Sequence, residues 1–80
     1  MRTDDADLVL AVGELVQAVT GTPAGQVRPE HTFVDDLGID SLAMLEVLAG
    51  CARLGTPVRD EATAQLVHVG DLVDYLRHHR

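Results

Sequence analysis

Residues 33–47, FVDDLGIDSLAMLEV, carry the chain from a polar turn directly into a helix-like run, with a serine at the boundary. The apolar spacing of this run predicts a helix from about Asp40 to Leu54, which the GTP of residues 55–57 ends. Serine and aspartate are both favoured at helix N-caps. One interpretation of Ser41 is therefore that it is only an N-cap, and a functional role needs further evidence.

The composition limits the kind of protein. Eighty residues predict one domain, residues 1–80, too small for a large enclosed catalytic cleft. The hydrophobic share is 46% with one Phe, one Tyr and no Trp, so the core is expected to be aliphatic. A net charge of -7, with arginine but no lysine, argues against nucleic acid or an anionic membrane as partner. The negative charge favours partners with basic patches on their surface. The protein is also expected to be a monomer.

The cysteine content and the hydropathy of the chain limit its disulfide bonds, its metal sites and its cellular location. The single Cys51 excludes an internal disulfide and a cysteine-cluster zinc site, and no metal site is predicted. No apolar run is long enough to span a membrane and no signal pattern is visible, so a cytoplasmic protein is expected. The start at Met1 and the absence of flanking linkers predict a discrete protein instead of an excised module.

Three other segments show helical signals. The first has an apolar stripe at Leu8, Val12, Leu15 and Val19, with Val16 beside it, and acidic residues suited to its N-terminal end at Asp4, Asp5 and Asp7. A short third helix is expected within residues 59–66. The last helix is expected from Val69 to Leu76, with one apolar face made by Val69, Leu72, Val73 and Leu76.

A long polar loop, residues 26–38, separates the first two helices. Loops of this length in small domains are often functional. Four apolar residues are expected to fasten it to the core: Val27, Phe33, Val34 and Leu37. No segment shows convincing strand alternation. The predicted fold class is all-α, a small four-helix bundle with a short third helix and a long loop between the first and second helices.

The predicted second helix has two apolar faces. The face expected to meet the core holds Met44, Val47, Leu48 and Cys51. The opposite face holds Leu42, Leu45 and Ala49, together with the charges of Glu46 and Arg53. Two interpretations stay open: this outer face is an exposed docking surface for a partner, or the preceding loop covers Leu42 and Leu45.

The sequence gives Ser41 no partner for nucleophilic catalysis. The GIDSL around it lacks the second glycine of a G-x-S-x-G nucleophile elbow. The four histidines, at positions 31, 68, 78 and 79, lie in the loop or near the last helix and offer no evident general base. A hydrolase is therefore set aside, and no catalytic residue is predicted. A helix-turn-helix protein that binds DNA is also set aside, because the net charge of the chain is negative.

Residues 35–47, DDLGIDSLAMLEV, resemble the carrier motif of acyl carrier proteins. The similarity runs through nearly the whole chain: an amphipathic first helix, a TG…V loop, TFVDDLGIDSL, and a terminal VGDLVDYL. In this family the serine of D-S-L receives 4'-phosphopantetheine from coenzyme A, and Ser41 matches that serine. Asp40 and Leu42 match its neighbours, and Glu46 matches an acidic position that helps partner enzymes dock.

The resemblance implies a carrier without catalytic activity of its own. Its cofactor would be covalent 4'-phosphopantetheine on Ser41, with the acyl group held as a thioester. Its partners would be a phosphopantetheinyl transferase, an acyl-loading acyltransferase or adenylating ligase, and a ketosynthase or other acyl-processing enzymes. Partners would meet Leu42, Leu45, Glu46 and Ala49. The interior that admits an acyl chain would be lined by Met44, Val47, Leu48 and Cys51, the last as a packing residue.

The chain departs from the usual pattern of the family. Ala43 and Ala52 stand where acids are common, and Arg53 reverses a charge, which favours polyketide or related specialised metabolism over housekeeping fatty acid synthesis. Ile39 and Asp40 favour the acyl type over a peptidyl or aminoacyl carrier of nonribosomal-peptide pathways, which stays an alternative. A second alternative is a helical docking domain in which Ser41 is only an N-cap.

Overall fold

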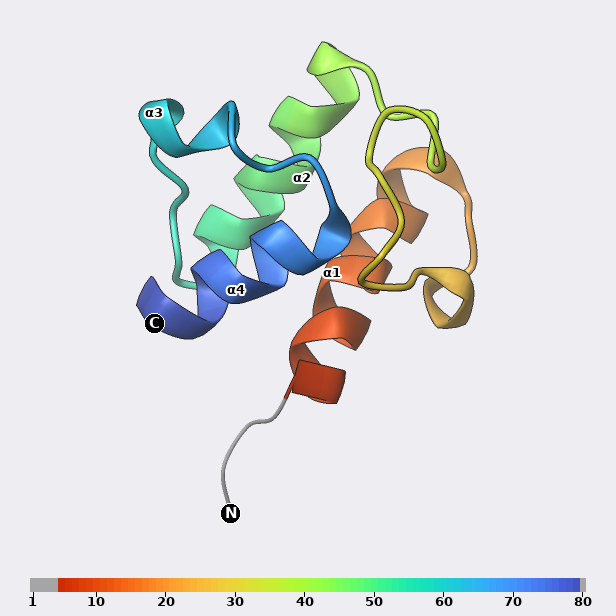
Figure 1. Ribbon diagram of the computed structural model, residues 1–80, viewed down its shortest axis with the longest axis horizontal. Coiled ribbons are helices and arrows are strands. Elements are labelled where there is room, and N and C mark those ends of the chain that lie inside the picture. The colour runs from red at the N-terminus through yellow and green to blue at the C-terminus, as the bar shows by residue number, and fades with distance from the viewer. Residues whose placement is uncertain (1–4, 80) are drawn as a thin grey trace.

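The computed structural model describes residues 5–79, with side chains from residue 6 onward (Figure 1). It contains α1 (Asp5–Thr20), the 3-10 helix η1 (Ala24–Gln26), α2 (Ser41–Arg53), α3 (Asp60–Thr63) and α4 (Val69–His79). Within these residues the only extended pairing is an isolated antiparallel bridge between Thr32 and His68. The all-α fold with a short third helix is confirmed, and α4 extends three residues beyond its predicted end. Asp4 lies outside the described residues.

The helices meet around an aliphatic core, with α1 packed against both α2 and α4. Phe33 is the one aromatic side chain among the buried residues of the described chain. The predicted apolar face of α4 is confirmed, since all four of its residues are buried. The buried hydrophobic residues contributed by the helices are Val12, Val16, Val47, Cys51, Val69, Leu72, Val73 and Leu76.

Two glycines allow close contacts that a side chain would prevent. A Cβ at Gly50 in α2 would overlap the side chain of Leu15 in α1, and one at Gly13 would lie 2.8 Å from the carbonyl oxygen of Ala24. Glycine within a helix costs about 1 kcal/mol relative to alanine. At Gly50 that cost accompanies a closer approach of α2 to α1.

Backbone hydrogen bonds fasten the long loop to the segment between α3 and α4. The Phe33 N–H donates to the Val67 carbonyl (3.0 Å), and the Val69 N–H donates to the His31 carbonyl (2.9 Å). The Asp71 carboxylate accepts the N–H groups of Val67 and His68, at 3.0 and 2.8 Å. The bonds to His68 and Val67 lower the pKa of Asp71. The loop therefore reaches α2 from a fixed position.

The prediction that Val34 belongs to the core is wrong. Val27 and Phe33 are buried and Leu37 packs against the core, but Val34 is 69% exposed. Phe33 and Val34 both lie in a turn, in which the Phe33 N–H donates to the Val67 carbonyl and the Gly38 N–H donates to the Val34 carbonyl. This turn places the ring of Phe33 in the core and leaves the side chain of Val34 in solvent. Ile39, which was not assigned to the core, is almost fully buried instead.

Candidate functional site

Asp40, not Ser41, caps α2. Asp40 has extended backbone (φ -86°, ψ -176°), and its Oδ1 accepts the Ala43 N–H at 2.8 Å. Its carbonyl accepts the N–H of Met44 at 2.9 Å. Ser41 is the first residue of the helix. The interpretation of Ser41 as N-cap is therefore wrong, because capping needs the non-helical backbone that the preceding residue has.

The cap contributes to stability. We expect Asp40→Ala to lower the free energy of unfolding by about 0.5–2 kcal/mol, because it removes the side-chain acceptor of a helix N–H. Asparagine is an equally good cap, so Asp40→Asn is the matched control and should unfold close to the wild-type midpoint. Urea denaturation followed by circular dichroism measures both. Equal losses in the two variants would show that the charge of Asp40, and not its capping bond, carries the effect.

The turn before Ser41 is held by hydrogen bonds and by burial. Gly38 has a positive φ of 66°, which favours glycine, and the Ile39 N–H donates to the Phe33 carbonyl at 2.8 Å. Ile39 is buried two residues before Ser41. These contacts fix the direction in which the chain enters α2, and they leave the side chain of Ser41 exposed.

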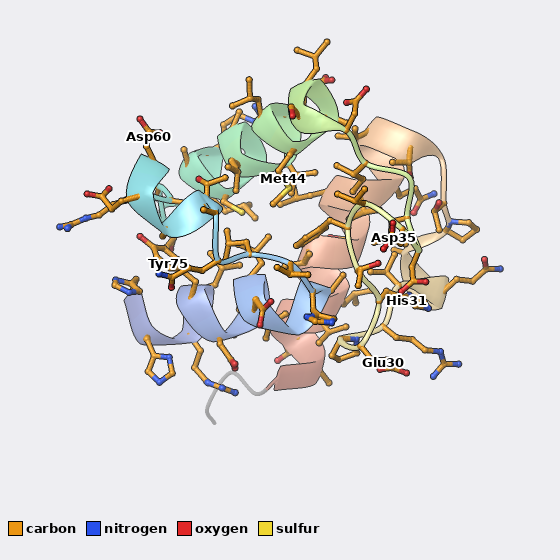
Figure 2. The ribbon with its side chains drawn as sticks, turned by 45° about the horizontal axis from the view of Figure 1, so that its top comes forward. Glu30, His31, Asp35, Met44, Asp60 and Tyr75 are labelled. Atoms are coloured by element: carbon orange, nitrogen blue, oxygen red, sulfur yellow. The ribbon has the colours of Figure 1, made fainter. Side chains whose placement is uncertain are left out.

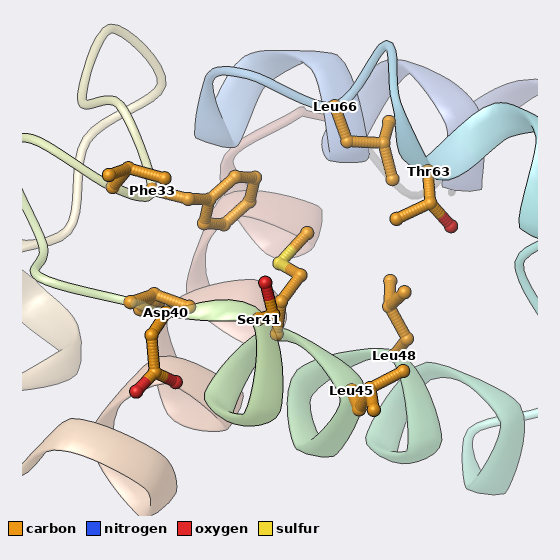
Figure 3. A pocket seen from close by; sticks show the side chains of 10 residues that line it. Phe33, Asp40, Ser41, Leu45, Leu48, Thr63 and Leu66 are labelled. Carbon is orange, nitrogen blue, oxygen red and sulfur yellow. The ribbon is translucent and has the colours of Figure 1, made fainter.

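Ser41 lies beside a cavity of about 350 Å³ with mostly apolar walls. Figure 3 shows the Ser41 hydroxyl directed toward this space while the Asp40 carboxylate points away from it. The loop, α2, and the segment from α3 toward α4 each form one wall. The lining residues are Phe33, Val34, Ile39, Asp40, Ser41, Met44, Leu45, Leu48, Thr63 and Leu66.

The two faces of α2 have the burial expected of them. Val47 and Cys51 are fully buried, and Met44 and Leu48 pack against the core; Figure 2 shows Met44 directed to the interior. On the outer face Leu42 is 69% and Leu45 62% exposed, and Glu46 and Ala49 are also exposed. The interpretation in which the loop covers Leu42 and Leu45 is therefore wrong.

The expected lining residues separate into two groups. Met44 and Leu48 line the cavity, whereas Val47 and Cys51 lie in the core and do not line it. Burial raises the pKa of the Cys51 thiol to about 11, so the thiol stays protonated and inert near neutral pH. Sequence reasoning missed the opposite wall, which Thr63 and Leu66 supply.

No described histidine lines the cavity beside Ser41. His31 Nδ1 accepts the Arg28 N–H at 3.1 Å, and His68 Nδ1 lies 3.4 Å from an Asp71 carboxylate oxygen. Within residues 5–79, no group of three or more His, Cys, Asp or Glu side chains could hold a metal ion. No helix in this part of the chain is long and apolar enough to cross a membrane.

Comparison with known proteins assigns the chain to a family. The family described as "phosphopantetheine attachment site" matches residues 11–76. The acyl carrier protein of Acidothermus cellulolyticus is 35% identical over 95% of this chain and 92% of its own length. The meromycolate extension acyl carrier protein of Mycolicibacterium aurum is 37% identical over 96% and 80%, and the acyl carrier protein of Thermobifida fusca 33% over 96% and 99%. The chain therefore belongs to the acyl carrier proteins, which are not enzymes but carry acyl groups on covalently attached 4'-phosphopantetheine.

Proposed function

We propose that Ser41 is the residue that carries 4'-phosphopantetheine, and that residues 1–80 form a single carrier domain. The observation that carries this proposal is the placement of one exposed hydroxyl at the first residue of α2, beside an apolar cavity. Ser41 is also the only serine in the chain. The hydroxyl is open to another enzyme, which is what modification from outside requires.

The start of α2 suits the phosphodiester. The first N–H groups of a helix and its dipole favour an anion at this end. The carboxylate of Asp40 points away from the cavity side of Ser41, which limits its repulsion of a phosphate there. The thiol at the end of the attached arm holds the acyl group as a thioester.

The loading reaction needs a base from the partner. Ser41 Oγ forms a bond to the phosphorus next to the pantetheine, the pyrophosphate bond of coenzyme A breaks, and adenosine bisphosphate leaves. The hydroxyl proton passes to a base on the phosphopantetheinyl transferase, since no described histidine lines the cavity beside Ser41 and the Asp40 carboxylate points away from it. The chain itself contributes position and exposure, and the transferase contributes the chemistry.

The cavity gives an acyl chain a place away from water. Its walls include Met44 and Leu48 from α2 and Leu66 from the segment before α4. Apolar surface that leaves water gains roughly 25 cal/mol per Å². We propose that cargo enters between these walls, while Val47 and Cys51 support them from the core.

The outer face of α2 is proposed as the docking surface for partners: the transferase, an acyltransferase or adenylating ligase, and a ketosynthase or other acyl-processing enzyme. Its residues are Leu42, Leu45, Glu46 and Ala49, all exposed. Exposed apolar side chains with a charged rim are typical of interfaces. The finding that supports this role is the exposure of both leucines within four residues of Ser41.

Leu45→Glu tests the docking surface. Because Leu45 is largely exposed, we expect the free energy of unfolding to change by less than about 0.5 kcal/mol. The kcat/KM for loading by a transferase should fall about tenfold, which corresponds to about 1.4 kcal/mol of lost binding. Leu54→Glu is the matched control, since Leu54 is 65% exposed at the other end of α2. Parallel loss of stability and loading in Leu45→Glu would show that Leu45 is structural.

The pathway is proposed to be polyketide, antibiotic or related specialised biosynthesis in the cytoplasm. The support is the low negative charge of α2. Ala43 and Ala52 stand at positions where acidic residues are common in the family, and Arg53 adds a positive charge. A second candidate, extension of long fatty acyl chains, is favoured by the names of relatives that are meromycolate extension acyl carrier proteins. A peptidyl or aminoacyl carrier is the remaining alternative.

Mass spectrometry of the protein purified from its native host distinguishes these pathways. An acyl chain with keto or hydroxyl groups at alternate carbons would support polyketide assembly. A long hydrocarbon chain would contradict it and support the second candidate. An amino acid on the thioester would support the peptidyl or aminoacyl alternative.

A further inference from the structure

Val34 lies in a hydrogen-bonded turn that leaves its side chain exposed to solvent. The Thr32 N–H donates to Asp36 Oδ2 (2.8 Å), and the Asp36 N–H donates back to Thr32 Oγ1 (3.0 Å). The Leu37 N–H donates to the Thr32 carbonyl and the Gly38 N–H to the Val34 carbonyl, both at 3.1 Å. We call residues 32–38 the Val34 turn. Its bonds fix the backbone on both sides of a largely exposed valine, and that side chain contributes little to the core.

The Val34 turn borders the same cavity as Ser41. Val34 and Leu45 both line this cavity, one from the loop and one from α2. Val34, Leu42 and Leu45 are thus three exposed apolar side chains around the modified position, on two different elements. The outer face of α2 is only part of the apolar surface around Ser41.

The negative charge near Ser41 lies mainly on the loop. Asp35, Asp36 and Asp40 are exposed there, and Figure 2 shows Asp35 on this loop. On α2 the charges are Glu46 and Arg53, which are opposite in sign. A partner with basic side chains therefore gains more from the loop than from α2.

We propose that Val34, with Asp35 beside it, is a second docking contact for the phosphopantetheinyl transferase. The inference rests on the proposed role of Ser41. The transferase must bring coenzyme A to bonding distance of Ser41 Oγ, whereas later enzymes reach the cargo through a long arm. A stable interface covers about 800 Å² of each partner. An interface centred on Ser41 extends over both α2 and the Val34 turn, so the transferase receives Val34 in an apolar pocket with a basic side chain near Asp35.

The test measures kcat/KM for loading of the complete chain with coenzyme A and a transferase. We expect Val34→Asp to lower it about tenfold and Asp35→Lys about threefold, with circular dichroism melts unchanged. Val34→Leu keeps the apolar contact and should load at nearly the wild-type rate. Leu54→Asp is the control, because it puts the same charge at an exposed apolar position at the far end of α2.

The outcomes separate this inference from the proposed function. Wild-type loading together with unchanged kcat/KM in Val34→Asp and Asp35→Lys would overturn the second contact and leave Ser41 as the attachment site. A wild-type chain that takes up no phosphopantetheine would overturn both proposals. Equal losses in Val34→Asp and Leu54→Asp would also overturn the inference, since a general charge effect would then explain the result.

Discussion

Ser41→Ala should abolish addition of phosphopantetheine while the fold stays intact. The substitution removes the oxygen that forms the phosphodiester, and no other serine exists in the chain to replace it. Alanine is the best helix former and Asp40 still caps α2, so the helix should begin at the same residue. Intact mass after incubation with coenzyme A and a broadly tolerant transferase measures loading, and a thermal melt measures the fold.

Thr63→Val is the control for this experiment. Thr63 has the other side-chain hydroxyl among the residues that line the cavity. Its Oγ1 donates to the Arg59 carbonyl at 3.2 Å, and valine has a similar shape without the hydroxyl. Thr63→Val should load as the wild type does. Loading of Ser41→Ala, or loss of loading in Thr63→Val alone, would contradict the assignment of Ser41.

Phe33→Ala should lower the free energy of unfolding more than Asp40→Ala, Leu45→Glu or Val34→Ala. Phe33 is 2% exposed and fastens the loop before α2 to the core. Truncation of a buried Phe typically lowers the free energy of unfolding by about 3–5 kcal/mol. The total free energy of unfolding of a domain of 80 residues is about 4–12 kcal/mol, at roughly 0.05–0.15 kcal/mol per residue. Phe33→Ala should therefore remove a large part of the total free energy of unfolding, measurable as a fall in the midpoint of urea denaturation.

Val34→Ala is the matched control, one residue away on the same loop. Because Val34 is largely exposed, its truncation should change the free energy of unfolding by less than about 0.5 kcal/mol. A contrast of this size between neighbouring residues would follow from their opposite orientations. Similar losses in both variants would mean that both side chains pack in the core.

The helices were predictable because their apolar residues recur with helical period. The stripes of α1 and α4 place Val12, Val16, Leu72 and Val73 on faces that are buried. The start of α2 was predicted at Asp40, and the structure gives Asp40 the cap and Ser41 the first helical position. The sequence could not decide between them alone, because both residue types are good caps and the choice depends on backbone conformation.

The loop and the cavity were less predictable, because tertiary contacts set them. Nothing in the local pattern distinguishes Phe33 from Val34, and the direction of each depends on the pairing of the loop with Val67. The far wall of the cavity, Thr63 and Leu66, comes from a short segment without strong helical period. The sequence placed Leu42, Leu45 and Glu46 on one side of α2, but it left open whether the loop covers the two leucines, and the structure shows both exposed.

Localisation of the arm on the wild-type protein tests the central claim most directly. The chain is loaded from coenzyme A by a transferase, digested, and its peptides are sequenced by tandem mass spectrometry. The account predicts one phosphopantetheine per chain, attached to Ser41 and to no threonine or tyrosine. An arm on any other residue, or an unmodified chain beside a second carrier protein that the same transferase loads fully, would contradict it.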